Sequence, residues 1–119
     1  MLTSKPPQNT DKYFWTDHAK GKLTQYGLSS SRVTRIMRSP ERVEEAIVED
    51  CFAAMQTVGN KNKNELWVMW QNVIKDKSSA ASISKKKIIS AWRYPGVTQP
   101  GKEIPLPADT LDSLSSLTK

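Results

Sequence analysis

The sequence predicts an α+β fold in which two N-terminal helices pack on a four-stranded, mainly antiparallel sheet. Two segments with helical periodicity come first, and four short runs rich in β-branched and aromatic residues follow them. Because the helical segments precede the strands instead of alternating with them, we expect a meander rather than a parallel sheet. The tryptophans at positions 15, 67, 70 and 92 are expected to supply much of the core.

The composition indicates the chemical class of the partner and the cellular compartment. A net charge of +6, from 18 basic and 12 acidic residues, favours an anionic partner, of which nucleic acid is the commonest. The single cysteine, Cys51, cannot form a disulfide within the chain. No apolar run approaches the roughly 20 residues that span a bilayer, and the first residues lack the apolar segment of a signal peptide. We therefore expect a cytoplasmic protein that contacts no membrane.

The chain is expected to form one domain with a tail at each end. Residues 1–12 are polar and contain Pro6-Pro7, which predicts a mobile arm. Residues 13–96 hold the predicted helices and strands. Residues 97–119 carry prolines and glycine and are predicted to be a linker-like tail, in which three leucines near its end can form one or two amphipathic turns.

The first helix is expected to follow an N-cap at Thr16 and to stop at Gly27. Its apolar residues recur at the i, i+4, i+7 spacing of a buried stripe: Ala19, Leu23 and Tyr26. The other side of the helix carries polar residues at the same spacing: His18, Lys22 and Gln25. If this helix carries catalytic residues, we expect them on the side that bears His18 and Lys22.

The second helix is expected to begin after Ser29 and to end at Ser39-Pro40. Beside its apolar side runs a row of arginines, which a fourth arginine follows just after the helix: Arg32, Arg35, Arg38 and Arg42. Two interpretations of this row stay open. It can be a solvated helix face, or it can guide the phosphate backbone of RNA.

Four strands are expected after the helices, at Val43–Val48, Cys51–Val58, Leu66–Trp70 and Ile88–Tyr94. The third is apolar on both faces, which predicts a central strand covered on both sides. Residues 75–87 show no periodicity and are predicted to be a loop.

The last strand places charged and phenolic groups on a rigid element. With period two, one face is expected to carry Ile88, Ser90, Trp92 and Tyr94, and the other Ile89, Ala91 and Arg93. Pro95-Gly96 then ends the strand. Arg93 and Tyr94 are therefore expected to be held steady at its exit.

Several kinds of chemistry lack support in the sequence. One histidine and one cysteine exclude a Cys/His zinc cluster within the chain. The glycine-rich loops that cradle nucleotides are absent, as is the nucleophile elbow of serine hydrolases. The neighbours Glu44 and Glu45 would point to opposite sides of a strand, which argues against a two-metal site. We therefore expect neither a metal nor a cofactor.

What remains is a metal-free set of residues, His18, Lys22, Arg93 and Tyr94. RNA cleavage without metal needs a base for the ribose 2′-OH, a cation for the charge on the phosphorane, and an acid for the leaving 5′-oxygen. Histidine transfers protons near neutral pH, and arginine offers a planar fork to phosphate oxygens. These residue types therefore suit metal-independent RNA cleavage.

Each of these residues also has a structural interpretation. His18 can be a solvated or capping histidine, and Lys22 a plain surface lysine. Arg93 can pair across the sheet with Glu44 or Glu45, and Tyr94 can be a half-buried aromatic at the sheet edge. Cys51 is expected to be a small buried hydrophobe rather than a reactive thiol.

Three short segments resemble BrnT-type toxins and related phage-derived domains of unknown function, which belong to the RelE/ParE-like superfamily. They are Trp15–Ala19, Tyr26–Ser29 and Ile88–Arg93. The resemblance spans about residues 13–96. It differs at Trp92, where the family usually has a second basic residue, and at Pro95-Gly96, which replaces a polar continuation.

The resemblance implies a RelE-like fold and a toxin-like, metal-independent endoribonuclease that cleaves mRNA, free or on the ribosome, by attack of the 2′-OH. It implies a cognate antitoxin protein as a partner. It marks His18, Lys22 and Arg93 as catalytic and adds Tyr94 by position. The departures keep open an alternative, a non-catalytic module of the same fold that binds RNA or a protein such as a topoisomerase.

Overall fold

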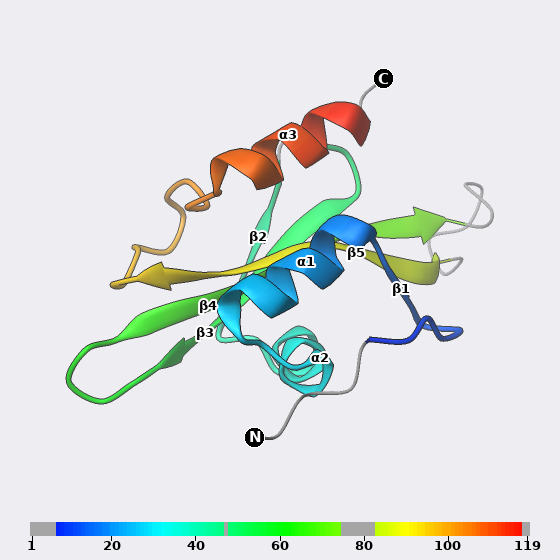
Figure 1. The fold of residues 1–119 in the computed structure, drawn as a ribbon. Helices are drawn as coiled ribbons and strands as arrows, with labels where there is room; N and C mark the ends of the chain where they lie inside the picture. Colours follow the sequence, from blue (N-terminus) through cyan, green and yellow to red (C-terminus); the bar gives the residue numbers. More distant parts are fainter. Residues whose placement is uncertain (1–6, 47, 75–82, 118–119) are drawn as a thin grey trace.

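A five-stranded mixed sheet lies at the centre of the molecule, with two helices over one face and a third over the other (Figure 1). The structure is a computed structural model that describes residues 7–46, 48–74 and 83–117. In chain order the elements are β1 (Tyr13–Trp15), α1 (Asp17–Tyr26), α2 (Ser30–Arg38), β2 (Arg42–Glu45), β3 (Cys51–Val58), β4 (Asn64–Ile74), β5 (Ile83–Pro95) and α3 (Ala108–Leu117). The strand order is β1-β5-β4-β3-β2.

The α+β class is confirmed, but the expected two helices and four strands are not. The described residues form three helices and five strands, and the first strand makes the sheet mixed. Strand β1 pairs in parallel with β5, from Tyr13 opposite Lys86 to Trp15 opposite Ile88. A run of three residues is too short to show a periodicity of its own, so the sequence does not predict this strand.

The ends of α1 and α2 lie where the sequence predicts them. The Thr16 side chain accepts a hydrogen bond from the Ala19 amide at 3.1 Å, and Ser29 accepts one from the Arg32 amide at 3.0 Å. Gly27 adopts a left-handed conformation with φ of 65°, and the Leu28 amide donates to the Leu23 carbonyl at 2.9 Å, as in a Schellman motif. This turn sets the direction of α2.

The strands agree in part with expectation. Strand β4 is the central strand of five, and residues 65–70 are all buried. Strand β2 stops at Glu45, short of the expected end at Val48. Strand β5 begins at Ile83, so the expected loop is wrong for residues 83–87, and the part at 75–82 lies outside the described residues.

A β-bulge in β5 exchanges the faces of two isoleucines. Met69 pairs with Ser90 and Trp70 with Ile88, which leaves Ile89 as an extra residue. As a result Ile88 packs in the core under α1 and α2, while Ile89 packs on the α3 side, opposite to the expected assignment. After the bulge the two-residue period holds as predicted.

The segment after β5 is part of the packed structure. The buried Glu65 carboxylate accepts hydrogen bonds from the Thr98 amide and hydroxyl, both at 2.8 Å. On α3, Leu114 is buried against the sheet and the Thr110 hydroxyl lies 2.7 Å from that of Ser90. Residues beyond 96, expected to be a linker-like tail, therefore cover the second face of the sheet.

The described part of the N-terminal arm is hydrogen-bonded to the start of the sheet. The Trp15 amide donates to the Asn9 side chain at 2.8 Å, and the Tyr13 amide donates to the Thr10 hydroxyl at 3.1 Å. Residues 7–12 therefore lie beside β1. None of the helices in the described ranges is long and apolar enough to cross a membrane.

Candidate functional site

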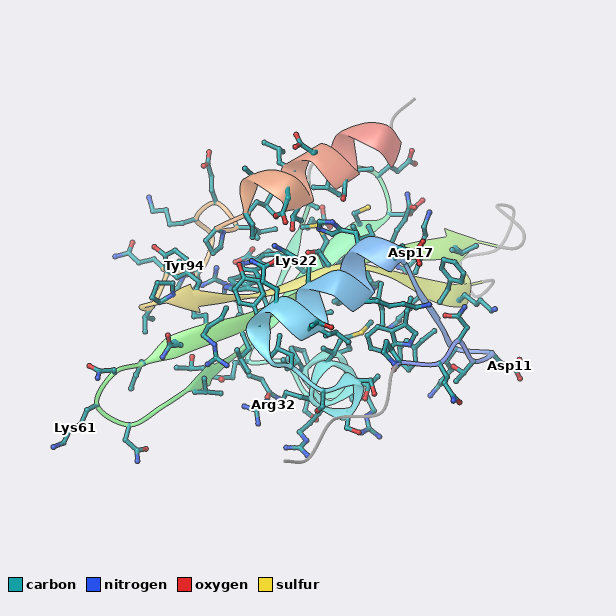
Figure 2. All side chains as sticks on the ribbon, viewed as in Figure 1. Asp11, Asp17, Lys22, Arg32, Lys61 and Tyr94 are labelled. Carbon is teal, nitrogen blue, oxygen red and sulfur yellow. The ribbon has the colours of Figure 1, made fainter. Side chains whose placement is uncertain are left out.

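The four residues expected to be catalytic lie in three places. His18 and Lys22 are on the side of α1 that meets α3, and Figure 2 shows Lys22 between these helices. Arg93 lines a pocket beside α2, whereas Tyr94 is half-buried on the opposite face of the sheet and packs against the core on the α3 side. Successive residues of a strand point to opposite faces. One bound group therefore cannot be contacted by Arg93 and Tyr94 from the same side.

Lys22 connects α1 to α3. Its ammonium lies 2.7 Å from Asp109 Oδ2 and 3.0 Å from Oδ1, and it donates to Gln25 Oε1 at 3.3 Å. It also lies 5.0 Å from the centre of the Tyr26 ring. Only 3% of Lys22 is exposed. Lys22 is thus a buried, fully partnered cation and not the surface lysine of the structural interpretation.

The third member of this cluster is His18. Its Nε2 atom is buried and has no hydrogen-bond partner within the described ranges. The hydrogen bond from Lys22 is the largest cause of the lowered pKa of the Asp109 carboxyl, and the charge of His18 lowers that pKa further. His18, Lys22 and Asp109 therefore form one polar cluster at the junction of α1 and α3.

Arg93 and Arg32 line a pocket of about 370 Å³ on the face of the sheet that α1 and α2 cover, away from the junction of α1 and α3. It is lined by residues of the turn between the helices, the start of α2 and three strands: Gly27, Leu28, Ser29, Arg32, Val58, Leu66 and Arg93. The left-handed turn at Gly27 places α2 so that its N-terminal end borders the pocket. We name this space the arginine pocket.

The arginine pocket carries positive charge that no carboxylate in its lining compensates. Neither Arg32 nor Arg93 has an ion pair with a described residue, and no carboxylate is among the pocket's lining residues. The Arg32 Nε atom is buried without a hydrogen-bond partner in the described chain. The start of α2 adds the positive end of a helix dipole. Such a pocket suits an anion, and the planar forks of two guanidinium groups match a phosphate.

The remaining arginines of the predicted row lie in different settings. Arg35 and Arg38 are exposed in the last turn of α2. Arg42 is on the α3 side, where its Nη1 donates to the Thr98 carbonyl at 3.2 Å. Its Nε lies 2.8 Å from Glu44 Oε2, close enough for an ion pair but without hydrogen-bond geometry, and its side chain is only 12% exposed. Arg42 therefore belongs to the packing around residue 98 and not to the arginine pocket.

The contacts of Glu44, Tyr94 and Cys51 can be compared with the structural interpretations given above. Glu44 is one of the two carboxylates expected to pair with Arg93. It forms an ion pair with Arg42 instead, and it accepts a hydrogen bond from the Gly101 amide at 3.0 Å. Tyr94 is half-buried, as its structural interpretation expects. Burial raises the pKa of the Cys51 thiol to about 11, which keeps it protonated near neutral pH.

Two contributors to these clusters were not predicted from the sequence. The prolines and glycine after residue 96 predict a linker and so hide Asp109, although a proline at 107 with an acidic residue two positions later is a signal for a helix start. The Gly27–Ser29 turn was predicted only as a helix stop and a helix cap. No sequence signal indicates that it borders Arg93.

No protein-family model, no curated protein and no solved structure matches this chain. In the ranges that the structure describes, no group of three or more histidine, cysteine, aspartate or glutamate side chains is arranged to hold a metal ion.

Proposed function

We propose that this chain is an RNA-binding module that grips the phosphate backbone at the arginine pocket. The observation that carries the proposal is that Arg32 and Arg93, neither of them ion-paired in the described structure, line one pocket. The net charge of +6 supports it, because cations that contact phosphates release condensed counterions and attract the polyanion from a distance.

Further basic residues extend the surface on either side of the pocket. Arg35 and Arg38 continue along α2, and the loop that follows Val58 carries Lys61 and Lys63, both exposed. Figure 2 shows Lys61 on this loop at the end of the molecule. Exposed positive charge therefore lies on two of the segments that border the arginine pocket, which favours contacts to an RNA backbone that do not depend on sequence.

The arrangement favours binding over catalysis. Lys22 is occupied by Asp109, and Arg93 lies on a different face of the sheet from Tyr94. Trp92, at the position where the resembling toxins carry a second basic residue, is buried in the α3-side core and stacks on Trp67 with ring centres 6.0 Å apart. After β1, the chain order of two helices followed by the antiparallel strands β2 to β5 supports a RelE-like fold, and the separation of Lys22, Arg93 and Tyr94 supports its non-catalytic form.

Removing either arginine tests the proposal. We expect Arg32→Ala and Arg93→Ala each to weaken binding of a fluorescein-labelled 12-nucleotide RNA about tenfold or more, because a charge-assisted hydrogen bond contributes about 1.5–3 kcal/mol. Fluorescence anisotropy at one fixed salt concentration measures the change. Lys102→Ala removes the same charge from an exposed residue outside the pocket and is expected to bind as wild type. Equal losses in all three variants would contradict the assignment of the pocket.

Cleavage of the bound RNA is a second candidate, favoured by one observation. The Nε2 of His18, beside Lys22, is buried and has no hydrogen-bond partner among the described residues, so no described group competes with a substrate proton for it; cleavage requires the RNA to reach the junction of α1 and α3 as well as the arginine pocket. We expect any such activity to persist in EDTA and to leave 2′,3′-cyclic phosphate ends. It should be lost in His18→Ala and in Arg93→Ala.

Mass spectrometry of the products from free and ribosome-bound mRNA detects these ends. Intact RNA after incubation with wild-type protein rejects the ribonuclease and leaves the binding proposal standing. An antitoxin partner follows only from the ribonuclease candidate: a neighbouring gene product that restores growth of cells expressing the wild type would support it.

A further inference from the structure

We infer that a second pocket, across the first turn of α2 from Arg32, receives an unpaired base of the same RNA, which makes single-stranded RNA the substrate class. The inference rests on the proposed function. The pocket has a volume of about 180 Å³ and is lined by residues of the N-terminal arm, β1 and α2: Gln8, Thr10, Tyr13, Trp15, Ser30, Ser31 and Thr34. We name it the tyrosine pocket.

The two pockets flank the same helix turn. Ser29 and Arg32 line the arginine pocket, and the intervening Ser30 and Ser31 line the tyrosine pocket. A helix with its side chains is about 10–12 Å across, and stacked nucleotides advance about 3.4 Å each along a strand. About three nucleotides therefore separate a phosphate in the first pocket from a base in the second.

An aromatic ring and unpaired polar groups line the tyrosine pocket. Tyr13 is half-buried against the core under α1 and α2, which holds its ring in place. The Tyr13 and Trp15 amides donate to the Thr10 hydroxyl and the Asn9 side chain, which joins the N-terminal arm to β1 along this wall. Its volume is below the roughly 300–1,000 Å³ of sites for drug-sized ligands. A single base fits this size class.

The polar groups suit the edge of a base. In the part of the chain that the structure describes, the side chains of Gln8, Ser30 and Ser31 make no hydrogen bonds. An amide offers both donors and an acceptor, and a hydroxyl offers both roles. The lining residues include no carboxylate; Asp11 follows Thr10 in the chain and in Figure 2 lies, like the tyrosine pocket, on the side of α2 opposite to Arg32. A strand's phosphates therefore meet no acidic lining residue in this pocket.

This combination distinguishes single strands from duplexes. Proteins that bind single strands join a basic groove to aromatic side chains on which unpaired bases stack. A base within a duplex is paired and stacked, so it cannot enter a recessed pocket without being splayed out. The arginine pocket alone would accept either form, whereas the tyrosine pocket accepts only the unpaired one.

The first test changes the ligand and leaves the wild-type protein intact. Three labelled probes carry the same strand of 12 phosphates: a single-stranded RNA, the same strand with abasic ribose at every other position, and its blunt duplex. We expect the abasic strand and the duplex to bind about fivefold or more weakly than the native strand, since a stacked base contributes about 1–3 kcal/mol. The slope of log K against log salt should be the same for the native and abasic strands.

The second test changes the pocket. Tyr13→Leu removes the ring, Tyr13→Phe keeps it, and Phe14→Leu removes a neighbouring aromatic that is 40% exposed and outside the pocket. We expect at least a fivefold loss for Tyr13→Leu and affinities near wild type for the other two. Gln8→Ala alters an exposed side chain that makes no hydrogen bond, so its expected threefold or larger loss is separable from misfolding.

The outcomes separate the two proposals. Equal affinity for native and abasic strands, together with wild-type binding by Gln8→Ala, overturns the tyrosine pocket and leaves the arginine pocket standing. No binding of any strand by the wild-type protein overturns both. The supporting result is a loss with abasic RNA and with Gln8→Ala while the salt slope stays unchanged.

Discussion

Arg93 and Arg42 have the same side chain but opposite electrostatic surroundings. Arg42 is held by Glu44 and the Thr98 carbonyl, and its guanidinium carbon lies 4.9 Å from the centre of the Trp67 ring. Arg93 shares a pocket with Arg32 and has no ion-pair partner in the described ranges. Arg42 is therefore already compensated within the fold, whereas Arg93 remains available for an external anion.

The Lys22–Asp109 contact gives a prediction about mutation. Asp109→Asn leaves a buried ammonium without its carboxylate, so we expect the free energy of unfolding to fall by about 1–3 kcal/mol. Urea unfolding followed by tryptophan fluorescence measures this difference. Asp112→Asn makes the same chemical change at an exposed position of α3 and is expected to alter stability by less than about 0.5 kcal/mol. Equal effects of the two variants would contradict the role of the contact.

The same contact predicts a dependence on pH. The Lys22 hydrogen bond holds the folded-state pKa of Asp109 below its ordinary value of 3.8. A lowered folded-state pKa stabilises the protein above pH 3.8, and this contribution is lost as the pH falls through the folded-state pKa. We expect wild type to lose more stability than Asp109→Asn between about pH 5 and pH 2. Parallel curves for the two proteins in urea titrations would show that the pair does not couple folding to protonation.

The ends of α1 and α2 could be predicted because each is set by residues that are neighbours in the sequence. Thr16 and Ser29 accept from amides three positions later, and Gly27 supplies the left-handed turn. Strand β1 and the bulge at Ile89 depend instead on distant partners; the Thr16 hydroxyl, for example, donates to the Ile88 carbonyl, 72 residues away. Local sequence patterns carry no information about such contacts.

The candidate site also combines residues that the sequence indicates with long-range contacts that it does not. Arg32 and Arg93 were each predicted singly from charge and position, but their meeting in one pocket depends on how α2 crosses the sheet. Asp109 lies 87 residues after Lys22, so no spacing rule could join them. Sequence patterns therefore indicated individual residues without showing which of them share a pocket or a contact.

Helix α3 is expected to contribute to stability, since it covers the second face of the sheet. Leu114 is 1% exposed, so Leu114→Ala should lower the free energy of unfolding by about 2–4 kcal/mol through lost burial and a cavity. Leu111 is 46% exposed on the same helix, and Leu111→Ala should change it by less than about 1 kcal/mol. Thermal and urea unfolding of both variants measure this contrast. Similar small losses in both would mean that α3 is not packed as described.

The two faces of the sheet differ in what their polar side chains contact. The α3 face holds the stacked tryptophans, the Glu65 hydrogen bonds and the compensated Arg42. The face under α1 and α2 opens at both sides of the first turn of α2, where the arginine and tyrosine pockets lie. We therefore expect α3-side substitutions to act mainly on stability and substitutions in the pockets to act mainly on RNA affinity.

The salt dependence of RNA affinity reports directly on phosphate contacts at the arginine pocket. For a single-stranded RNA, log K falls with log salt by about 0.7 for each phosphate contacted. The double variant Arg32→Ala/Arg93→Ala should therefore have a slope about 1.4 smaller in magnitude than wild type. The control Lys20→Ala/Lys102→Ala removes equal charge away from the pocket and should keep the wild-type slope. A slope near zero for wild type, or equal slopes for the two double variants, would contradict phosphate binding at the arginine pocket.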